Sequence, residues 1–400
     1  MPTNVSGSNT GPNTSVTQNT SASLITAGVG GSGPRAATFV IAASNSLSTV
    51  GADYVCTGAN DDQIINAAIL ALPPNGGKIL FRAGTYNISA PIVIDRSWVD
   101  LEGENHPMWN SYLAPWNGIN TNATVGDRGA RINAVAGTDG FVLGNTNIPD
   151  QGESRHRGIR IAKFYITGTN YAGHGILSNT PHDFCCVEYN AIQRFNRGID
   201  GSWDTVLINN NSIQDINGQG ITGGGVNPRI VNNLIYDILG NAIVSTGSDC
   251  MIANNKIGDI ASDAITVGGY ATSIVGNQIG GVRGRAIVVG WSGCSITGNT
   301  IDYKSGPYGK ANRTQGAIFL VSGTDGVHPY GCNAVVGNTL IADETGESAG
   351  VYAIDGGSTA GNVIVGNAMR GAWNNTASAA AAINAALTGG TNQIANNATS

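Results

Sequence analysis

Three aspartates close together in the chain are the residues best suited to catalysis. Asp183 lies in the segment PHDF, and Asp200 and Asp204 lie in the segment GIDGSWD. Asp183 and Asp204 occupy the same position in successive copies of a repeat, so we expect them about 5 Å apart. Two carboxylates at that distance should not both ionise easily, which suits the acid and the nucleophile or base of a glycosidase. Asp200 is a third candidate. The alternative for all three is turn capping.

Aromatic side chains recur at neighbouring positions of the repeat. His182, Trp203 and Trp291 share one column, in which three glycines separate the tryptophans, and Tyr270 shares the column of Asp183. Because indole prefers partial burial, two tryptophans at the ends of a glycine strip could form a stacking platform for a sugar chain. The alternative is that each tryptophan packs beneath a neighbouring loop.

A column of polar residues follows the same repeat. Its members are His174, Arg197, Gln219, Asn241, Asp263 and Arg285. They could form a hydrogen-bonding track for a polar polymer. They could instead be a solvated turn face, with an Asp263–Arg285 ion pair worth under about 1 kcal/mol. A lyase needs a base at the sugar C5 and a cation on the uronate, and His174, Arg197 and Asp200 are the less favoured set for that reaction.

A second acidic column is formed by Asp215, Asp237 and Asp259, each four residues after a shared asparagine. It falls on a different turn, with no aromatic residue expected beside it. Turn capping or weak cation binding is the favoured interpretation, and the column ranks second as a catalytic position. We expect no cofactor, except a divalent cation if the protein is a lyase, and no metal ligands are predicted.

These columns depend on an internal repeat, which is the strongest signal in the sequence. The motif is apolar-x-(Asn/Gly)-Asn-x-apolar; its first interval is 21 residues, the next four are 22 each, and the last two are 39 and 29. Its shared asparagines are Asn190, Asn211, Asn233, Asn255, Asn277, Asn299, Asn338 and Asn367. An isoleucine column with the same interval contains Ile199, Ile221, Ile243, Ile265 and Ile287.

Short β-branched pairs separated by glycine and asparagine predict three short strands per coil, and therefore an all-β chain folded as a parallel β-helix. The leucine-rich repeat is excluded because its L-x-x-L-x-L pattern is absent. The isoleucines should form internal ladders. The asparagines should form an amide ladder, since asparagine favours left-handed turn positions. The small residues before the isoleucines, from Gly198 to Ala286, should face outward as a smooth floor.

Composition and motifs exclude several classes of function. Only 12% of the 400 residues are charged and the net charge is −6, so nothing favours nucleic acid as a partner. No apolar run is long enough to span a membrane, and residues 1–19 lack the apolar core of a signal peptide. P-loop, GxSxG and HExxH motifs are absent. The six cysteines lack CxxC spacing, so we expect packing residues rather than a zinc site.

The chain should divide into four parts. Residues 1–35 are expected to be a flexible or partner-ordered arm, and residues 36–76 an N-terminal cap with an amphipathic helix over 61–72. Residues 77–370 should form the β-helix, and residues 371–400 a C-terminal cap or tail with a short helix at 377–387. Caps are expected because an open end of a β-helix is an exposed edge.

The chain resembles the pectate-lyase-like right-handed parallel β-helix proteins. The resemblance rests on DDQIINAAILAL followed by GGKILFRAGTYNIS and VDLEGE, and covers roughly residues 50–370. Phage tailspikes, polysaccharide lyases and β-helical glycosidases share this pattern. It implies a protein that binds and degrades a polysaccharide, forms a homotrimer, and is extracellular or virion-associated, with its arm docking to a virion or other assembly.

Two alternatives to a polysaccharide-degrading enzyme stay open. The segment IDRSWVDLEGENH is similar to inulin fructotransferases, although the acidic pair of that family has no match in this chain. The other alternative is a non-catalytic structural or receptor-binding virion protein, in which Asp183 and Asp204 only cap turns.

Overall fold

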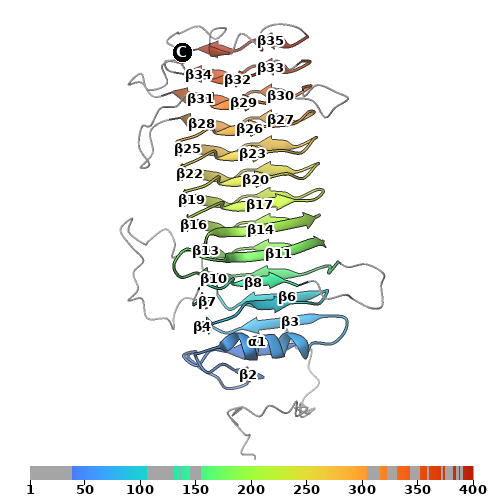
Figure 1. The fold of residues 1–400 in the computed structure, drawn as a ribbon, viewed down its shortest axis with the longest axis vertical. Coiled ribbons are helices and arrows are strands. Elements are labelled where there is room, and N and C mark those ends of the chain that lie inside the picture. Colours follow the sequence, from blue (N-terminus) through green and yellow to red (C-terminus); the bar gives the residue numbers. More distant parts are fainter. Residues whose placement is uncertain are drawn as a thin grey trace, which may run out of the picture.

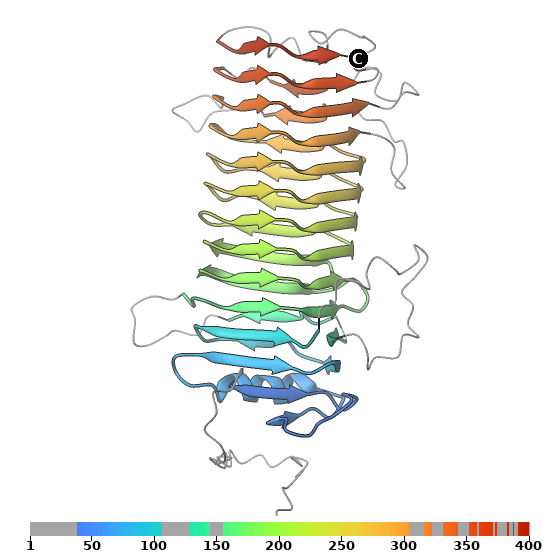
Figure 2. The same ribbon diagram turned by 180° about the vertical axis from the view of Figure 1, so that it is seen from behind.

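The chain winds into a column of stacked coils, with the helix α1 (Asp61–Leu70) at its N-terminal end (Figure 1). Each regular coil contributes one strand to each of three parallel sheets, which we name A, B and C. The stack is equally regular from behind (Figure 2). The computed structural model describes residues 38–105, 129–135, 137–144, 155–303, 316–321, 331–342, 352–357, 360–370, 373, 382–383, 387 and 391–399.

The strands of each sheet follow one another along the stack. Sheet A contains β2 (Tyr54–Val55), β1 (Phe39–Ala42), β3 (Gly77–Phe81), β6 (Val99–Gly103), β9 (Arg160–Ala162), β12 (Cys186–Glu188), β15 (Leu207–Asn209), β18 (Arg229–Val231), β21 (Met251–Ala253), β24 (Ser273–Val275), β27 (Ser295–Thr297), β30 (Ala334–Val336), β33 (Val363–Val365) and β35 (Gln393–Ala395). Sheet B contains β4 (Gly84–Ile88), β7 (Ala130–Ala134), β10 (Phe164–Thr167), β13 (Ala191–Gln193), β16 (Ser212–Ile216), β19 (Leu234–Ile238), β22 (Lys256–Ile260), β25 (Gln278–Val282), β28 (Thr300–Tyr303), β31 (Thr339–Ala342), β34 (Ala368–Arg370) and β36 (Ala398–Thr399). Sheet C contains β5 (Ile92–Ile94), β8 (Phe141–Leu143), β11 (His174–Asp183), β14 (Arg197–Asp204), β17 (Ile221–Gly224), β20 (Ile243–Ser245), β23 (Ile265–Val267), β26 (Ile287–Val289), β29 (Ile318–Leu320) and β32 (Ile354–Gly356).

The register between coils follows the predicted repeat. In sheet C, Ile199 pairs with Ile221 and Ile221 pairs with Ile243. The pairing continues to Ile265 and Ile287, and all five side chains are completely buried. The predicted isoleucine ladder is confirmed, and each stacked rung removes apolar surface from water along the core.

The asparagine ladder also forms, between sheets A and B. The Asn255 Oδ1 accepts hydrogen bonds from the backbone N–H and the Nδ2 of Asn233, at 2.9 and 3.0 Å. The Asn255 Nδ2 donates to Ile230 O and to Asn277 Oδ1, at 2.9 and 3.0 Å. The left-handed backbone belongs to the residue before each ladder position, such as Asn232 with φ 57°. The ladder therefore uses asparagine for its buried amide, and not for the left-handed preference that the sequence suggested.

The prediction that the small residues before the isoleucines face outward is wrong. Ala242, Ala264 and Ala286 are completely buried. A Cβ added at Gly198 would lie 2.4 Å from Gly220 O, so the neighbouring backbone allows only a small residue there. The three alanines occupy the corner directly before β20, β23 and β26, and Gly198 is the second residue of β14, so strict inward–outward alternation does not yet apply at these positions.

The helix α1 covers the N-terminal end of the stack, as predicted, but it ends at Leu70 rather than at residue 72. The completely buried Asp61 accepts hydrogen bonds from the backbone N–H groups of Thr57, Gly58 and Asn87, which joins the helix to β4. No helix in the described ranges has the length and apolar character that crossing a membrane requires.

The two predicted ends fall largely outside the described residues. The whole arm at 1–35 and most of the expected helix at 377–387 lie outside them. Strands β35 and β36 extend sheets A and B beyond residue 370. Among the cysteines, Cys186 is partly exposed and Cys332 is exposed, so the prediction of packing residues is confirmed only for the buried Cys56, Cys185, Cys250 and Cys294.

Candidate functional site

The two long strands of sheet C, β11 and β14, bring three polar residues together, and a fourth, Asp139, joins them from the segment before β8. His174 begins β11 and pairs with Arg197 at the start of β14. The His174 Nε2 lies 3.4 Å from Asp200 Oδ2, and the Arg197 Nη1 donates to the same oxygen at 2.7 Å. On its other side, His174 contacts Asp139 Oδ1 through its Nδ1 and its backbone N–H, at 2.9 and 2.7 Å. We call these four residues the His174–Asp200 centre.

The His174–Asp200 centre contains groups of opposite charge. Hydrogen bonds to Asp139 and then to Asp200 raise the pKa of His174 to about 9. Burial would raise the pKa of Asp200, but hydrogen bonds from His174 and Arg197 outweigh it and lower that pKa. At neutral pH an imidazolium and a carboxylate therefore lie side by side. A proton donor beside a group that stays ionised is the combination that acid–base catalysis requires.

The polar column continues from this centre along sheet C, as predicted. Asp263 forms an ion pair with Arg285, at 3.1 Å, as the alternative of a solvated turn face predicted, and accepts the Arg285 backbone N–H at 2.7 Å. Asn241 donates to Thr266 Oγ1 at 3.1 Å and accepts the Asp263 backbone N–H at 3.3 Å. Gln219 lies one coil before Asn241 and, like the others, is half-buried. The outer edge of sheet C therefore presents successive hydrogen-bonding groups over several coils.

Asp183 and Asp204 are paired in adjacent strands, as predicted, but two arginines compensate their charges. The Arg155 Nη1 lies 3.6 Å from Asp183 Oδ1 and also contacts Asp204 Oδ2. The Arg157 Nε lies 3.4 Å from Asp183 Oδ2. The Asp204 Oδ1 accepts the backbone N–H of Val226 at 2.9 Å and so caps the next turn. The repulsion expected from the sequence is therefore offset, and the turn-capping alternative fits Asp204.

His182 and Trp203 align in neighbouring coils, but both side chains are completely buried. The expectation that they contact a substrate at the surface is therefore wrong. The alternation along β14 gives the reason, because Ile199 and Trp203 face the core while Asp200 and Asp204 lie at the intervening positions. The two-residue period of a strand predicts that Trp203 faces the core like Ile199, whereas the alignment of turn positions alone does not.

His182 packs against His156, which is also buried. The His182 Nδ1 accepts the backbone N–H of His156 at 3.3 Å, and the two imidazole rings stack with centroids 5.6 Å apart. The His156 Nε2 lies 2.7 Å from Asp95 Oδ1. Burial lowers the pKa of His182 to about 4, so this ring is neutral at pH 7.

Of the other predicted contacts, Trp291 is half-buried and Tyr270 is exposed, so both stay predictions.

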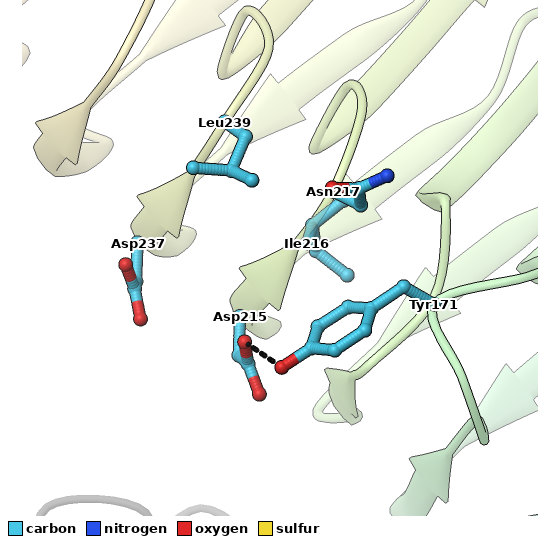
Figure 3. A pocket seen from close by; sticks show the side chains of 6 residues that line it. All are labelled: Tyr171, Asp215, Ile216, Asn217, Asp237 and Leu239. Carbon is cyan, nitrogen blue, oxygen red and sulfur yellow. Dashed lines mark hydrogen bonds between the residues drawn. The ribbon is translucent and has the colours of Figure 1, made fainter. Parts of the chain in front are cut away.

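Asp215 and Asp237 of the second acidic column line a cavity, and an aromatic residue does lie beside them. The Tyr171 hydroxyl donates to Asp215 Oδ1 at 2.9 Å, and Asp237 projects next to Asp215 in the following coil (Figure 3). The cavity has a volume of about 290 Å³ and is lined by Tyr171, Asp215, Ile216, Asn217, Asp237 and Leu239. Burial, and then the charge of Asp215, raise the pKa of Asp237. Among the described residues, no group of three acidic, histidine or cysteine side chains could hold a metal ion.

Replacing Tyr171 with phenylalanine should lower the free energy of unfolding by about 0.5–1 kcal/mol, because it removes one exposed hydrogen bond to Asp215. Urea denaturation of the two proteins measures the difference. The control is Tyr270→Phe, which removes another exposed phenol hydroxyl and should leave stability unchanged. A loss above about 2 kcal/mol would show that Tyr171 supports more than this bond.

Three residues contact the candidates without having been assigned to them from the sequence, namely Asp139, Arg155 and Arg157. The sequence suggested only that Arg155 and Arg157, beside His156, could wall a groove or contact another subunit. All three precede the regular part of the repeat, where insertions break the 22-residue interval. An alignment of GIRIA with FCCVE would have placed Arg157 opposite Asp183, and the bridge between these residues shows that register. No comparable signal marks Asp139, which lies before β8.

Comparisons with known proteins find similar folds at low sequence identity. No protein-family model and no curated protein sequence matches the chain. A mutant DFA-IIIase of Arthrobacter chlorophenolicus A6, solved in complex with DFA-III, has a TM-score of 0.64 at 18% identity, covering 78% of this chain and 81% of that one. The A-module of the mannuronan C-5 epimerase AlgE6 of Azotobacter vinelandii has a TM-score of 0.51 at 15% identity, covering 86% and 97%. At these identities the likeness concerns the fold.

Proposed function

Because this chain has the pectate-lyase-like right-handed parallel β-helix fold, as its sequence predicts, we propose that it is a carbohydrate-processing enzyme. The substrate would lie along the outer face of sheet C and react at the His174–Asp200 centre. The observation that carries the proposal is the contact at 3.4 Å between a histidine whose pKa is raised and an aspartate whose pKa is lowered. The solved neighbours, a DFA-IIIase and a mannuronan epimerase, support a carbohydrate substrate.

In the proposed mechanism, His174 is the general acid and Asp200 the nucleophile or base. The His174 Nε2–H gives its proton to the glycosidic oxygen as the bond to the anomeric carbon breaks. The Asp200 carboxylate attacks that carbon, or removes a proton from the water or sugar hydroxyl that attacks it. Where Asp200 is the nucleophile, neutral His174 then takes a proton from the water or sugar hydroxyl that displaces Asp200 from the sugar. Where Asp200 is the base, the proton that it has removed returns to His174. Asp139 and Arg197 are positioning residues, since they hold His174 and Asp200 through the contacts described above.

The same centre also suits a uronate substrate. His174 and Arg197 place two cations beside Asp200, and a sugar carboxylate could pair with both. A β-elimination would then use Asp200 as the base at C5. End-group analysis of the products separates the two reactions, because a lyase leaves new unsaturated ends whereas a hydrolase leaves reducing ends.

The Asp200→Asn variant should test the proposed centre. On whichever of GF2, DFA-III, mannuronan or an arrayed polysaccharide the wild type converts, kcat should fall at least about a hundredfold, with little change in KM. The matched control is Asp263→Asn, which removes another arginine-paired aspartate from the same polar column. Because Asp263 lies outside the His174–Asp200 centre, this variant should retain kcat even where KM rises. Retained activity in Asp200→Asn, with activity lost in Asp204→Asn, would move the site to the Asp183–Asp204 pair.

A second candidate function is carbohydrate binding without catalysis, as in a structural or receptor-binding protein. It is favoured by the Asp183–Asp204 pair, whose charges Arg155 and Arg157 offset and whose Asp204 caps a turn. Glycan binding with no product from any arrayed polysaccharide would support this function. The resemblance also leads us to propose a homotrimer, an association with a virion and an extracellular location. Light scattering of the full chain tests the homotrimer.

A further inference from the structure

Two exposed aromatic residues follow one turn column between sheets C and A. Trp98 precedes β6 and Phe184 precedes β12, and they are 56% and 61% exposed. Gly158 occupies the coil between them. All three have left-handed backbones, with φ of 60°, 53° and 64° for Trp98, Phe184 and Gly158. At the coil spacing of about 4.8 Å, the two aromatic Cα atoms lie about 10 Å apart.

The stacking of the coils fixes the orientation of this strip. The backbone N–H of Trp98 donates to Arg157 O at 2.7 Å, and that of Gly158 donates to Asp183 O at 3.1 Å. A Cβ added at Gly158 would lie 2.2 Å from Cε3 and 2.6 Å from Cζ3 of Trp98. The six-membered ring of the indole therefore extends over the Gly158 backbone toward the coil of Phe184. We call Trp98, Gly158 and Phe184 the aromatic strip.

The aromatic residues of the strip are costly for the fold. A left-handed backbone costs a residue with a side chain about 1–2 kcal/mol, whereas glycine adopts it freely. Gly158 shows that glycine is accommodated in this column. More than half of each aromatic side chain stays in water, so burial offsets only part of the strain. Strained and exposed aromatic residues are typical of binding surfaces.

Charged groups border the aromatic strip. Asp183 directly precedes Phe184, and Arg157 directly precedes Gly158. Arg155 contacts Asp183, and both arginine side chains are more than a third exposed. An apolar protein surface would leave these groups desolvated without partners, which is unfavourable. A sugar ring has an apolar C–H face for an aromatic ring and hydroxyl groups for carboxylates and guanidiniums.

We propose that the aromatic strip is a carbohydrate subsite, at which a sugar ring stacks on Trp98 and Phe184 and its hydroxyls bind Arg155, Arg157 and Asp183. The inference rests on the proposed carbohydrate function and extends it. The subsite lies at the opposite end of β11 and β14 from the His174–Asp200 centre. The four residue-to-residue steps from Asp200 to Asp204, which pairs with Asp183, span about 13 Å, so a substrate that reaches both places is an oligosaccharide.

Glycine substitutions test the strip because they remove the rings and relieve the backbone strain together. For Trp98→Gly and Phe184→Gly, affinity for an oligosaccharide should fall at least tenfold each, while the free energy of unfolding stays equal or rises. The matched control is Ala271→Gly, which relieves a φ of 53° in the same turn column without removing a ring and should keep full affinity. The probes are GF2, mannuronan oligosaccharides and a glycan array, with titration calorimetry and protection of Trp98 fluorescence from acrylamide.

The outcomes separate this inference from the proposed reaction. Wild-type affinity in the Trp98→Gly, Phe184→Gly double variant would overturn the subsite, and so would a clear loss of stability, since the rings would then be structural. The subsite is also overturned if no probe protects Trp98 in the wild type. Protection of Trp98 without any conversion of the bound glycan would retain the subsite and reject the catalytic centre. Cleavage that depends on Asp200 but not on Trp98 or Phe184 would do the reverse.

Discussion

Replacing Asn255 with alanine should lower the free energy of unfolding by about 4 kcal/mol. The Asn255 amide makes four buried hydrogen bonds, two accepted from Asn233 and one each donated to Ile230 O and Asn277 Oδ1. Alanine leaves the buried backbone N–H of Asn233 without its acceptor, and a buried group without a partner costs about 1–3 kcal/mol. The other lost bonds and the cavity add to this cost. Urea denaturation followed by circular dichroism measures it.

The matched control for this variant is the adjacent residue. Asn254 is exposed and has a left-handed backbone with φ 56°, so Asn254→Gly should change stability by less than about 0.5 kcal/mol. If Asn255→Ala were as mild as Asn254→Gly, the ladder would be incidental to stability. Hydrogen exchange should show the loss concentrated in neighbouring coils, because each coil of a solenoid contacts only its neighbours.

The regular coils could be predicted from sequence because one period governs both their spacing and their burial. An interval of 22 residues places Ile199 on Ile221 and Asn233 on Asn255, and each rung repeats the same local energetics. The pairing of Asp183 with Asp204 followed from the same count. The repeat interval alone therefore predicts which residues stack on one another in neighbouring coils.

The charges around the candidate site could not be predicted in the same way. Whether two aspartates repel depends on the groups between them, and Arg155 and Arg157 enter from a coil that insertions have displaced from the period. Asp139 reaches His174 from an equally irregular coil. The regular coils contain the period, whereas the irregular early coils contain the residues that decide the electrostatics.

A left-handed backbone at Trp98 or Phe184 also had no sequence signal. Glycine or asparagine marks such a turn in most other coils, and an aromatic residue gives no comparable indication. Only the stacking of these residues with Gly158 shows that they share one column. The residues that break the local preference are those that the structure adds to the candidate site, as expected where function opposes stability.

Stability should fall by up to about 3 kcal/mol between pH 6.5 and pH 4, because of His182. Burial lowers the pKa of this histidine to about 4 in the folded chain, whereas the unfolded value is about 6.5. Between these values the unfolded chain binds more protons, so the contribution is complete above pH 6.5 and is lost as the pH falls. His182→Gln should flatten this acidic limb in urea denaturation series.

His174 is the internal control for that pH profile, because its shift has the opposite sign. Its pKa of about 9 lies above the unfolded value, so its contribution is complete below pH 6.5 and is lost as the pH rises through 9. This alkaline limb should be smaller, since His174 is partly exposed and solvent screens its ion pairs. His174→Gln should flatten only the alkaline limb. An acidic limb that persists in His182→Gln, or a His182 imidazole that titrates above pH 6 by NMR in the wild type, would assign the acid sensitivity to other groups.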